Sequence, residues 1–326
     1  MDEPRICIVG AGRLSSRRIY PYVGAAGGVL VGVCDLDAEK ARANARRFGG
    51  TAHTDMARML EAERPDGVIV CTGPAGHAEL APIVMRRGIP VYTEKPPAPS
   101  AAEALEVARV SRQTGVLCTT AFKKRYNTAY TRARRWLDGW PPQQWASISV
   151  DYASSAYSNE AHGHAFLHDF AIHAIDLVGY LFGEVAEVFC FTKANHSYAV
   201  SLRFACGAVG SMNLTDARSF GVPTEEVEIT VDGGNFMTVH NSSCWRITEE
   251  QRAVEWREPP TFVSAGDSGS ETGHLAEIAD FFAAIAEGRS TRSCIHESYK
   301  SMVLYEAIAR SAETGEPVRP LYEATE

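Results

Sequence analysis

The sequence has no apolar stretch long enough to cross a bilayer, which takes about 20 residues. It opens with Met-Asp-Glu-Pro-Arg, and no basic segment followed by an apolar one is present there. We therefore expect no signal peptide and no membrane partner.

Paired cysteines are also missing. The eight cysteines are scattered, and none belongs to a Cys-x-x-Cys pair. Half of them lie inside apolar runs, where cysteine acts as a small hydrophobic residue: Cys7, Cys34, Cys71 and Cys118. We expect reduced thiols and a cytoplasmic location, with neither disulfides nor a bound metal.

Positive charge is in deficit, because 32 Lys and Arg stand against 40 Asp and Glu, a net charge of −8. The chain therefore has no basic field to attract a phosphate backbone, and nucleic acid is not expected as a partner. Internal repeats and low-complexity tracts are absent. At 326 residues the chain is long enough for two closely packed domains.

The first 120 residues alternate short apolar runs with helical patterns. The runs contain β-branched residues without in/out alternation, which is typical of strands buried on both faces of a parallel sheet: Ile6–Val9, Val29–Cys34, Gly67–Cys71, Val91–Thr93 and Val116–Thr120. Between them, Asp37 opens a helix to Phe48, and the capping box Ser100-x-x-Glu103 opens another. Such alternation predicts βαβ units.

The pattern changes after about residue 143. A half-buried strand is expected at Ser147–Tyr152 and a helix near 165–182. Further strands are expected near 186–193, 198–205, 208–215, 225–232 and 235–240. This predicts an α+β domain with a mostly antiparallel sheet. We place the domains at 1–122 and 123–326, with a late helix near 272–286 that belongs to the second domain or returns to the first.

A glycine turn follows the first predicted strand, at Gly10-Ala11-Gly12-Arg13-Leu14-Ser15. The first glycine permits a tight turn, and the second lets the backbone approach a pyrophosphate at the next helix's amino terminus. Ser15 stands where the usual fingerprint has a third glycine. An ordinary βα turn is the alternative interpretation.

Asp35 closes the second predicted strand, 23 positions after Gly12. A carboxylate there can accept hydrogen bonds from ribose hydroxyls and repels the 2′-phosphate of NADP. Its alternative role is a helix cap, which Asp37 can supply by itself. The sequence therefore predicts NAD as cofactor, preferred over NADP.

Lys95 lies at the end of another predicted strand, in Glu94-Lys95-Pro96. Pro96 favours extended geometry at Lys95, which directs the lysine side chain out of the sheet end. A lysine in a partly dry cleft can donate to a substrate oxygen. A solvated loop lysine is the alternative.

Asp169, His173 and Asp176 lie four and three residues apart on a helix that is otherwise almost wholly apolar. Buried ionisable residues need partners or a function, so the three form a candidate site or a self-satisfied core triplet. His162, His164 and His168 lie just upstream, but their spacing does not favour a metal site.

Together these motifs make the chain resemble the Gfo/Idh/MocA family, the relatives of glucose-fructose oxidoreductase and inositol dehydrogenase. The resemblance includes Thr72–Glu79, Ala121–Asn127 and the late helix around Glu277. It implies an α/β Rossmann dinucleotide-binding domain plus an α+β domain with a large, mostly antiparallel open sheet. That sheet would join a homodimer or homotetramer.

The resemblance also implies roles for individual residues. The cofactor would be bound by Gly10, Gly12, Arg13, Leu14, Asp35, Thr72, Gly73, His77, Glu94, Lys95 and Arg125. The substrate would be met by Lys95, Lys123, Tyr126, His162, His164, Asp169 and His173. Catalysis would rest on Lys95, His173 and Asp169, with Asp176 structural.

The implied activity is hydride transfer between nicotinamide and a secondary alcohol or ketone of a sugar, sugar derivative or cyclitol. Two alternatives stay open. One is a regulator of the same family that binds the dinucleotide without turnover. The other is a dihydrodiol- or biliverdin-type reductase, which Asp169-x-x-x-His173 disfavours.

Overall fold

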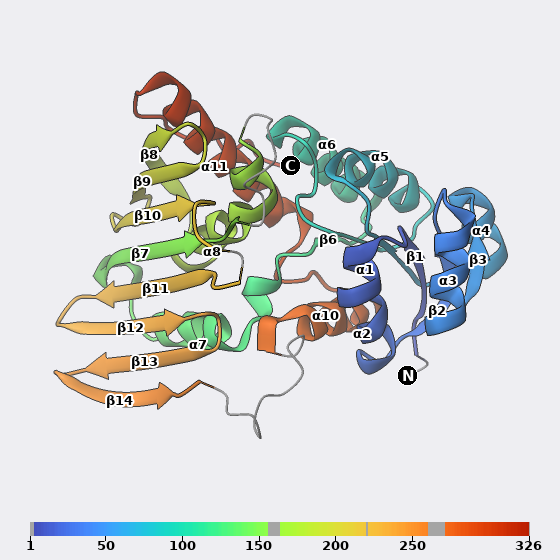
Figure 1. Cartoon of the computed structure of the whole chain (residues 1–326), viewed down its shortest axis with the longest axis horizontal. Helices are drawn as coiled ribbons and strands as arrows, with labels where there is room; N and C mark the ends of the chain where they lie inside the picture. Colours follow the sequence, from blue (N-terminus) through green and yellow to red (C-terminus); the bar gives the residue numbers. More distant parts are fainter. Residues whose placement is uncertain (1–2, 156–163, 220, 260–270, 326) are drawn as a thin grey trace. The chain divides into compact units, whose positions relative to one another are not determined.

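The protein, seen here as a computed structural model, is described over residues 3–155, 164–219, 221–259 and 271–325. Its contacts divide the chain into two compact units (Figure 1). Unit 1 and unit 2 are each built from separated segments of the chain: Met1–Lys123, Gly273–Tyr299 and Ala324–Glu326 for unit 1, and Lys124–Thr272 and Lys300–Glu323 for unit 2.

Unit 1 is built on a parallel sheet of six strands in the order β3-β2-β1-β4-β5-β6. The strands are β1 Arg5–Val9, β2 Val29–Cys34, β3 Thr51–His53, β4 Gly67–Val70, β5 Val91–Thr93 and β6 Cys118–Thr120. The five predicted strands are confirmed, and β3 is an edge strand that the sequence reading missed. The order reverses between β1 and β4, and ligands bind at such a switch point.

Helices cover both faces of this sheet. They are α1 Arg13–Arg18, α2 Tyr20–Ala25, α3 Ala38–Phe48, α4 Met56–Glu63, α5 Pro74–Met85, α6 Ala101–Thr114, α10 His274–Glu287 and the first turn of α11 Ile295–Thr314. One core cluster joins the sheet to α4, α5 and α6, and the other joins it to α2, α3 and α10. The predicted late helix is therefore α10, and it packs in unit 1.

The predicted helix caps are present. The Asp37 side chain accepts from the backbone N–H groups of Glu39 and Lys40 at the start of α3. The Ser100 hydroxyl accepts from the Glu103 N–H at 3.2 Å, which caps α6, and it donates to the Glu103 carboxylate at 2.6 Å.

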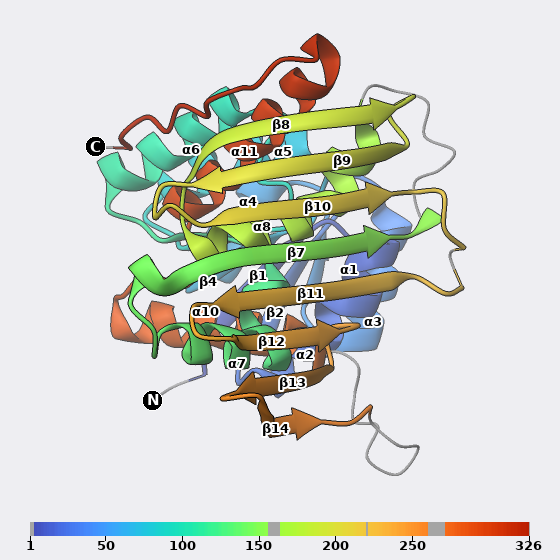
Figure 2. The same cartoon turned by 90° about the vertical axis from the view of Figure 1, so that its left-hand side faces the viewer.

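Unit 2 is built on an eight-stranded sheet in the order β14-β13-β12-β11-β7-β10-β9-β8 (Figure 2). The strands are β7 Trp145–Ala153, β8 Val185–Lys193, β9 Ser197–Phe204, β10 Val209–Thr215, β11 Thr224–Val231, β12 Asn235–His240, β13 Cys244–Glu249 and β14 Arg252–Arg257. Every pair is antiparallel except β7–β10. The mostly antiparallel sheet is confirmed, while β13 and β14 were not predicted.

The helical segments of unit 2 lie on one face of this sheet (Figure 2). They are η1 Lys123–Tyr126, which begins at the unit boundary, α7 Thr128–Leu137, η2 Pro142–Gln144, the π-helix η4 Phe166–Ala171, α8 Ile172–Phe182 and the rest of α11. Strand β9 alternates buried and exposed side chains, so the opposite face is open. No helix in the described ranges is both long and apolar enough to cross a membrane.

Candidate active site

The glycine turn in unit 1 depends on Gly10. This residue has φ +102°, and a Cβ there would lie 2.2 Å from the carbonyl oxygen of Cys71. Gly12 is the N-cap of α1, and a Cβ at that position would meet no atom within 4 Å. Ser15, in the place of a third glycine, is buried and donates to the Gly10 carbonyl at 3.0 Å. This hydrogen bond from Ser15 therefore stabilises the glycine turn.

Asp35 joins this turn to the next strand end. Its Oδ2 accepts from the Ala11 N–H at 2.7 Å, and its Oδ1 accepts from the Asp37 N–H at 2.9 Å. Each carboxylate oxygen keeps a second lone pair, so Asp35 can still accept from ribose hydroxyls.

Four other predicted cofactor residues surround the turn at exposed positions. Arg13 and Leu14 lie on the first turn of α1, and 49% of the Leu14 side chain is exposed. Thr72 and Gly73 follow β4, and Gly73 is the N-cap of α5 with no side-chain cap. These groups form an open edge at the carboxyl ends of β1, β2 and β4. The residues present therefore fit a bound dinucleotide.

His77 is a buried residue, 1% exposed, rather than a surface residue at the start of a helix. Its Nδ1–H donates to the carbonyl oxygen of Pro96 at 2.8 Å. Burial lowers the pKa of His77 to about 4, and the charge of Lys95 acts in the same direction. The neutral ring therefore supports the loop that carries Lys95, and its contact with the cofactor stays a prediction.

Lys95 follows β5 at the same carboxyl edge of the sheet, and its peptide bond to Pro96 is cis. Burial raises the pKa of Glu94, while the charges of Lys95 and Lys123 act in the opposite direction. Glu94 also accepts from the Lys95 N–H at 3.1 Å. The lysine is thus held beside a buried carboxyl group.

A second buried acid lies behind Glu94. Glu277, on α10, accepts a hydrogen bond from the Tyr92 hydroxyl at 2.8 Å and is fully buried. Burial, and then the proximity of Glu94, raises the pKa of Glu277 well above its usual value. Burial therefore favours the uncharged form of both carboxyl groups.

In unit 2 the other catalytic candidates lie where the chain changes helix type. The predicted single helix is wrong in its first part, because Phe166–Ala171 is a π-helix and only Ile172–Phe182 is α-helical. Such π-turns are frequent at functional sites. Asp169 lies in the π-helix and is partly exposed, whereas His173 in α8 is 8% exposed.

Asp176 is fully buried one turn after His173, and Arg125 and Ser301 hold it. Arg125 binds it through Nε and Nη2, at 3.0 Å to Oδ2 and 2.7 Å to Oδ1. The Ser301 hydroxyl donates to Oδ1 at 2.7 Å. Arg125 also lies over the ring of Tyr180. This geometry gives Arg125 a structural role, and its contact with the cofactor stays a prediction.

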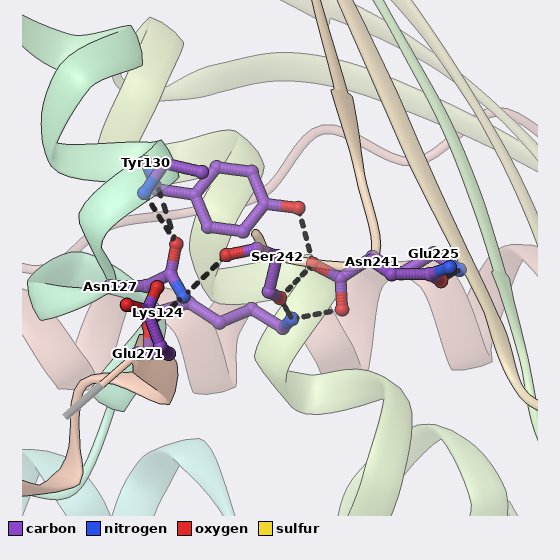
Figure 3. A network of polar contacts seen from close by, with 8 residues as sticks. Lys124, Asn127, Tyr130, Glu225, Asn241, Ser242 and Glu271 are labelled. Carbon is purple, nitrogen blue, oxygen red and sulfur yellow. Dashed lines mark hydrogen bonds and ion pairs between the residues drawn. The ribbon is translucent and has the colours of Figure 1, made fainter. Parts of the chain in front are cut away.

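A network that the sequence did not indicate anchors the segment around Arg125 (Figure 3). Lys124 forms an ion pair with Glu225 on β11 and donates to Ser242 at 3.2 Å. Burial acts to raise the pKa of Glu225, but Lys124, Ser242 and Tyr130 outweigh it, and the pKa is lowered.

Asn127 extends the network by donating to the carbonyl oxygens of Ser242 and Glu271 at 2.8 and 2.6 Å (Figure 3). The predicted substrate residue Tyr126 is buried in this anchored segment, and Lys123 is partly exposed at its start.

Two histidines upstream of Asp169, His162 and His164, were also predicted to contact the substrate. His164 is buried between the Tyr198 hydroxyl at 2.9 Å and the Glu313 carboxylate at 3.1 Å. Its predicted substrate contact stays a prediction, and His162 lies outside the described residues. In the described part of the chain, no cluster of His, Cys, Asp and Glu could hold a metal ion.

A cavity of about 490 Å³ in unit 1 lies at the opposite edge of the sheet. It is lined by residues that enter β5 and β6, including Pro90 and Leu117, and by Arg112, Cys294 and His296. Because these are amino ends of strands, the cavity is separate from the glycine turn and Lys95.

A sheet of this topology joined to an open α+β sheet is the architecture of two-domain, dinucleotide-dependent oxidoreductases. Family models make the assignment specific. "Oxidoreductase family, NAD-binding Rossmann fold" matches residues 4–122, and "Oxidoreductase family, C-terminal alpha/beta domain" matches residues 147–319. The chain belongs to this family, Gfo/Idh/MocA, and is a nicotinamide-dependent oxidoreductase.

Curated relatives are distant. The 4-carboxy-2-hydroxymuconate-6-semialdehyde dehydrogenase of Sphingobium sp. SYK-6 is 25% identical, over 89% of this chain and 93% of its own length. The scyllo-inositol 2-dehydrogenase (NAD(+)) of Bacillus subtilis is 28% identical over 57% of this chain and 56% of its own length. A levoglucosan dehydrogenase solved with NADH and L-sorbose has a TM-score of 0.86 at 22% identity, over 99% of this chain and all of its own.

Proposed function

We propose that the protein transfers a hydride between NAD and a secondary alcohol or ketone of a sugar, sugar derivative or cyclitol. The observation that carries the proposal is the placement of Lys95 at the same carboxyl edge of one sheet as the glycine turn and Asp35. Ligands of open α/β sheets bind at that edge, so a proton donor there lies near the cofactor.

The cofactor proposal rests on Asp35. Its carboxylate is fixed by two backbone N–H groups and keeps acceptor capacity for ribose hydroxyls. A 2′-phosphate would bring like charge to the same place. We therefore propose that NAD is preferred over NADP.

In the reaction that we propose, His173 and Lys95 have one task each. When bound, the nicotinamide ring supplies the hydride acceptor. In the oxidative direction His173 accepts the alcohol proton as general base. Lys95 donates to the same oxygen and stabilises its developing negative charge. Asp169 orients the pair, and the buried Arg125–Asp176 ion pair supports α8, which carries His173.

Substrate class is proposed from the relatives, several of which are named as dehydrogenases of cyclitols or sugars. The proposal competes with a regulator that binds the dinucleotide without turnover. Retention of Lys95, Asp169 and His173 favours an enzyme, because a binding protein needs no proton acceptor.

We also propose a homo-oligomer that works in the cytoplasm. The open face of the sheet in unit 2 carries Phe189 and Phe191, whose rings are 4.7 Å apart, and Val209. Phe191 is 69% exposed and Val209 54% exposed. An aromatic pair on an open sheet face is typical of a surface that another subunit covers.

The deciding experiment is a substrate screen that follows NADH formation at 340 nm. The panel holds cyclitols, aldoses, uronates, glycosides and levoglucosan, with 4-carboxy-2-hydroxymuconate-6-semialdehyde as a compound of another class. Turnover of a polyol supports the proposal. Turnover of the semialdehyde alone would show that the proposed polyol class is wrong. Tight NAD binding without any turnover would favour the regulator.

A further inference from the structure

His168 and Asp169 are consecutive residues whose side chains bind each other. His168 Nδ1 lies 2.6 Å from Asp169 Oδ1. Consecutive side chains on an α-helix diverge and do not face each other. Here both residues lie in the π-helix Phe166–Ala171, where the contact forms.

The surroundings fix which atom of His168 carries the proton. An ionised carboxylate only accepts, so the proton of this hydrogen bond lies on Nδ1. Nε2 is buried and has no partner among the residues that the structure describes. A second proton there would be a buried donor without an acceptor, which is costly. The ring therefore donates to Asp169 through Nδ1.

Packing holds this ring in place. Its centroid lies 5.1 Å from that of Tyr305 on α11, with the two planes at 60°. Burial raises the pKa of Tyr305 to about 12, and Glu306, Asp169 and Glu313 add to the effect. Tyr305 therefore stays neutral beside the His168–Asp169 pair.

We propose that His168 is a positioning residue, which fixes the carboxylate of Asp169 for catalysis by donating a hydrogen bond from Nδ1. The proposal rests on the proposed function, in which Asp169 orients the proton acceptor His173. The hydrogen bond engages Oδ1, and it thereby sets the plane in which both carboxylate oxygens lie. His168 is not part of the Asp169-x-x-x-His173 motif, so the motif alone gives it no role.

The test compares three replacements of His168 with the substrate found in the screen. His168→Asn keeps an N–H near the position of Nδ1, His168→Gln moves the N–H to the position of Nε2, and His168→Phe keeps only the ring. A hydrogen bond to a charged group corresponds to about tenfold or more in rate. We expect Gln and Phe to lower kcat by about that factor, Asn to recover most of it, and KM for NAD to stay unchanged.

Two controls separate positioning from a loss of folding. His196 forms the same kind of pair, with Nδ1 2.8 Å from Asp216 Oδ2 on another part of unit 2, so His196→Phe should leave kcat unchanged. In an Asp169→Ala background, His168→Phe should cause no further loss, because its effect passes through Asp169. Thermal melts of every variant report the folded fraction.

The possible results lead to different conclusions. If Asp169→Ala is harmless, the catalytic assignment of Asp169 fails and the inference fails with it. If Asp169→Ala is harmful but all three His168 variants match the wild type, only the inference is overturned. Equal losses for Asn and Phe would also overturn it, because an N–H near the position of Nδ1 would then fail to restore the rate.

Discussion

Arg125 and Asp176 form a fully buried ion pair within unit 2, with two hydrogen bonds of 2.7 and 3.0 Å between guanidinium and carboxylate. Ser301 adds a third donor to the carboxylate. The pair fixes α8 one turn after His173. Its contribution to stability differs from that of the exposed ion pairs. When one partner of this pair is removed, the other is left as a buried charge that water does not solvate.

Removing one partner of this pair should therefore be strongly destabilising. We expect Asp176→Asn and Arg125→Met each to lower the free energy of unfolding by about 3–5 kcal/mol, and Arg125→Lys to recover only part, since lysine cannot form two parallel bonds. Urea denaturation measures this. The control is Arg132→Ala, which breaks a part-exposed pair with Glu255 and should cost about 1 kcal/mol or less. Equal effects of Arg125→Met and Arg132→Ala would contradict the buried assignment.

Asp35 should determine the choice of cofactor. We expect the wild type to prefer NAD over NADP by at least about tenfold in kcat/KM. Asp35→Asn keeps an acceptor oxygen but removes the charge, so it should erode that preference with a small rise in KM for NAD. Asp35→Ser also loses the bond to Ala11 and should weaken both cofactors. Steady-state kinetics with both cofactors measure this, and a wild type that uses NADP as well as NAD would refute it.

Features that depend on neighbouring residues could be predicted from the sequence. The glycine turn, the Asp37 cap and the Ser100 capping box are each set within a few positions of one another. The buried strands of unit 1 were recognisable because both faces are apolar. By contrast, β13 and β14 are half exposed and lack a clean alternation, so the pattern gave no signal.

Features that depend on distant residues could not be predicted. Arg125 and Asp176 are 51 residues apart in the sequence, and Lys124 and Glu225 are 101 apart. Tyr92 and its partner Glu277 are 185 residues apart. No local pattern pairs them. The π-helix was missed for another reason, since offsets of three and four fit an α-helix equally well.

Because of His77, the free energy of unfolding should fall in mild acid. Its pKa is lowered to about 4 in the folded protein, against about 6.5 when unfolded, so the unfolded chain binds more protons between these values. Stability is therefore full above pH 6.5 and is lost as pH falls toward 4. We expect His77 to account for about 2 kcal/mol between pH 7 and pH 5. Urea midpoints at both pH values measure the loss.

The control for this prediction is His77→Asn, which keeps a donor for the Pro96 carbonyl but does not titrate. Its loss of stability between pH 7 and pH 5 should be smaller than that of the wild type. Some loss should remain, because burial also lowers the pKa of His274, to about 2. An unchanged loss in the variant would show that His77 is not a neutral buried ring.

The open face of the sheet in unit 2 should be a subunit interface. Phe191→Glu places a charge on the exposed aromatic pair of β8 and should shift the mass in light scattering toward the monomer. Ile83→Glu changes a side chain on α5 that is 37% exposed and should leave the assembly intact. A monomeric wild type at micromolar concentration would rule out the interface.

The catalytic proposal predicts how Lys95 and His173 behave together. Lys95→Ala and His173→Ala should each lower kcat by about a hundredfold or more, the usual scale for acid–base groups. Binding of NAD should change far less, because the glycine turn and Asp35 supply most of it. In the double variant the loss should be smaller than the product of the single losses, since the two side chains act on one oxygen.

The pH dependence of the oxidative rate completes that test. A general base must be unprotonated to accept the alcohol proton, so kcat/KM should rise with pH through one ionisation near neutrality, and His173→Ala should abolish that rise. His53→Gln is a matched control, because that histidine binds Glu63 in unit 1, away from Lys95, and should keep the wild-type profile. Near-wild-type turnover of either Lys95→Ala or His173→Ala would refute the assignment and return the regulator as the better account of the protein.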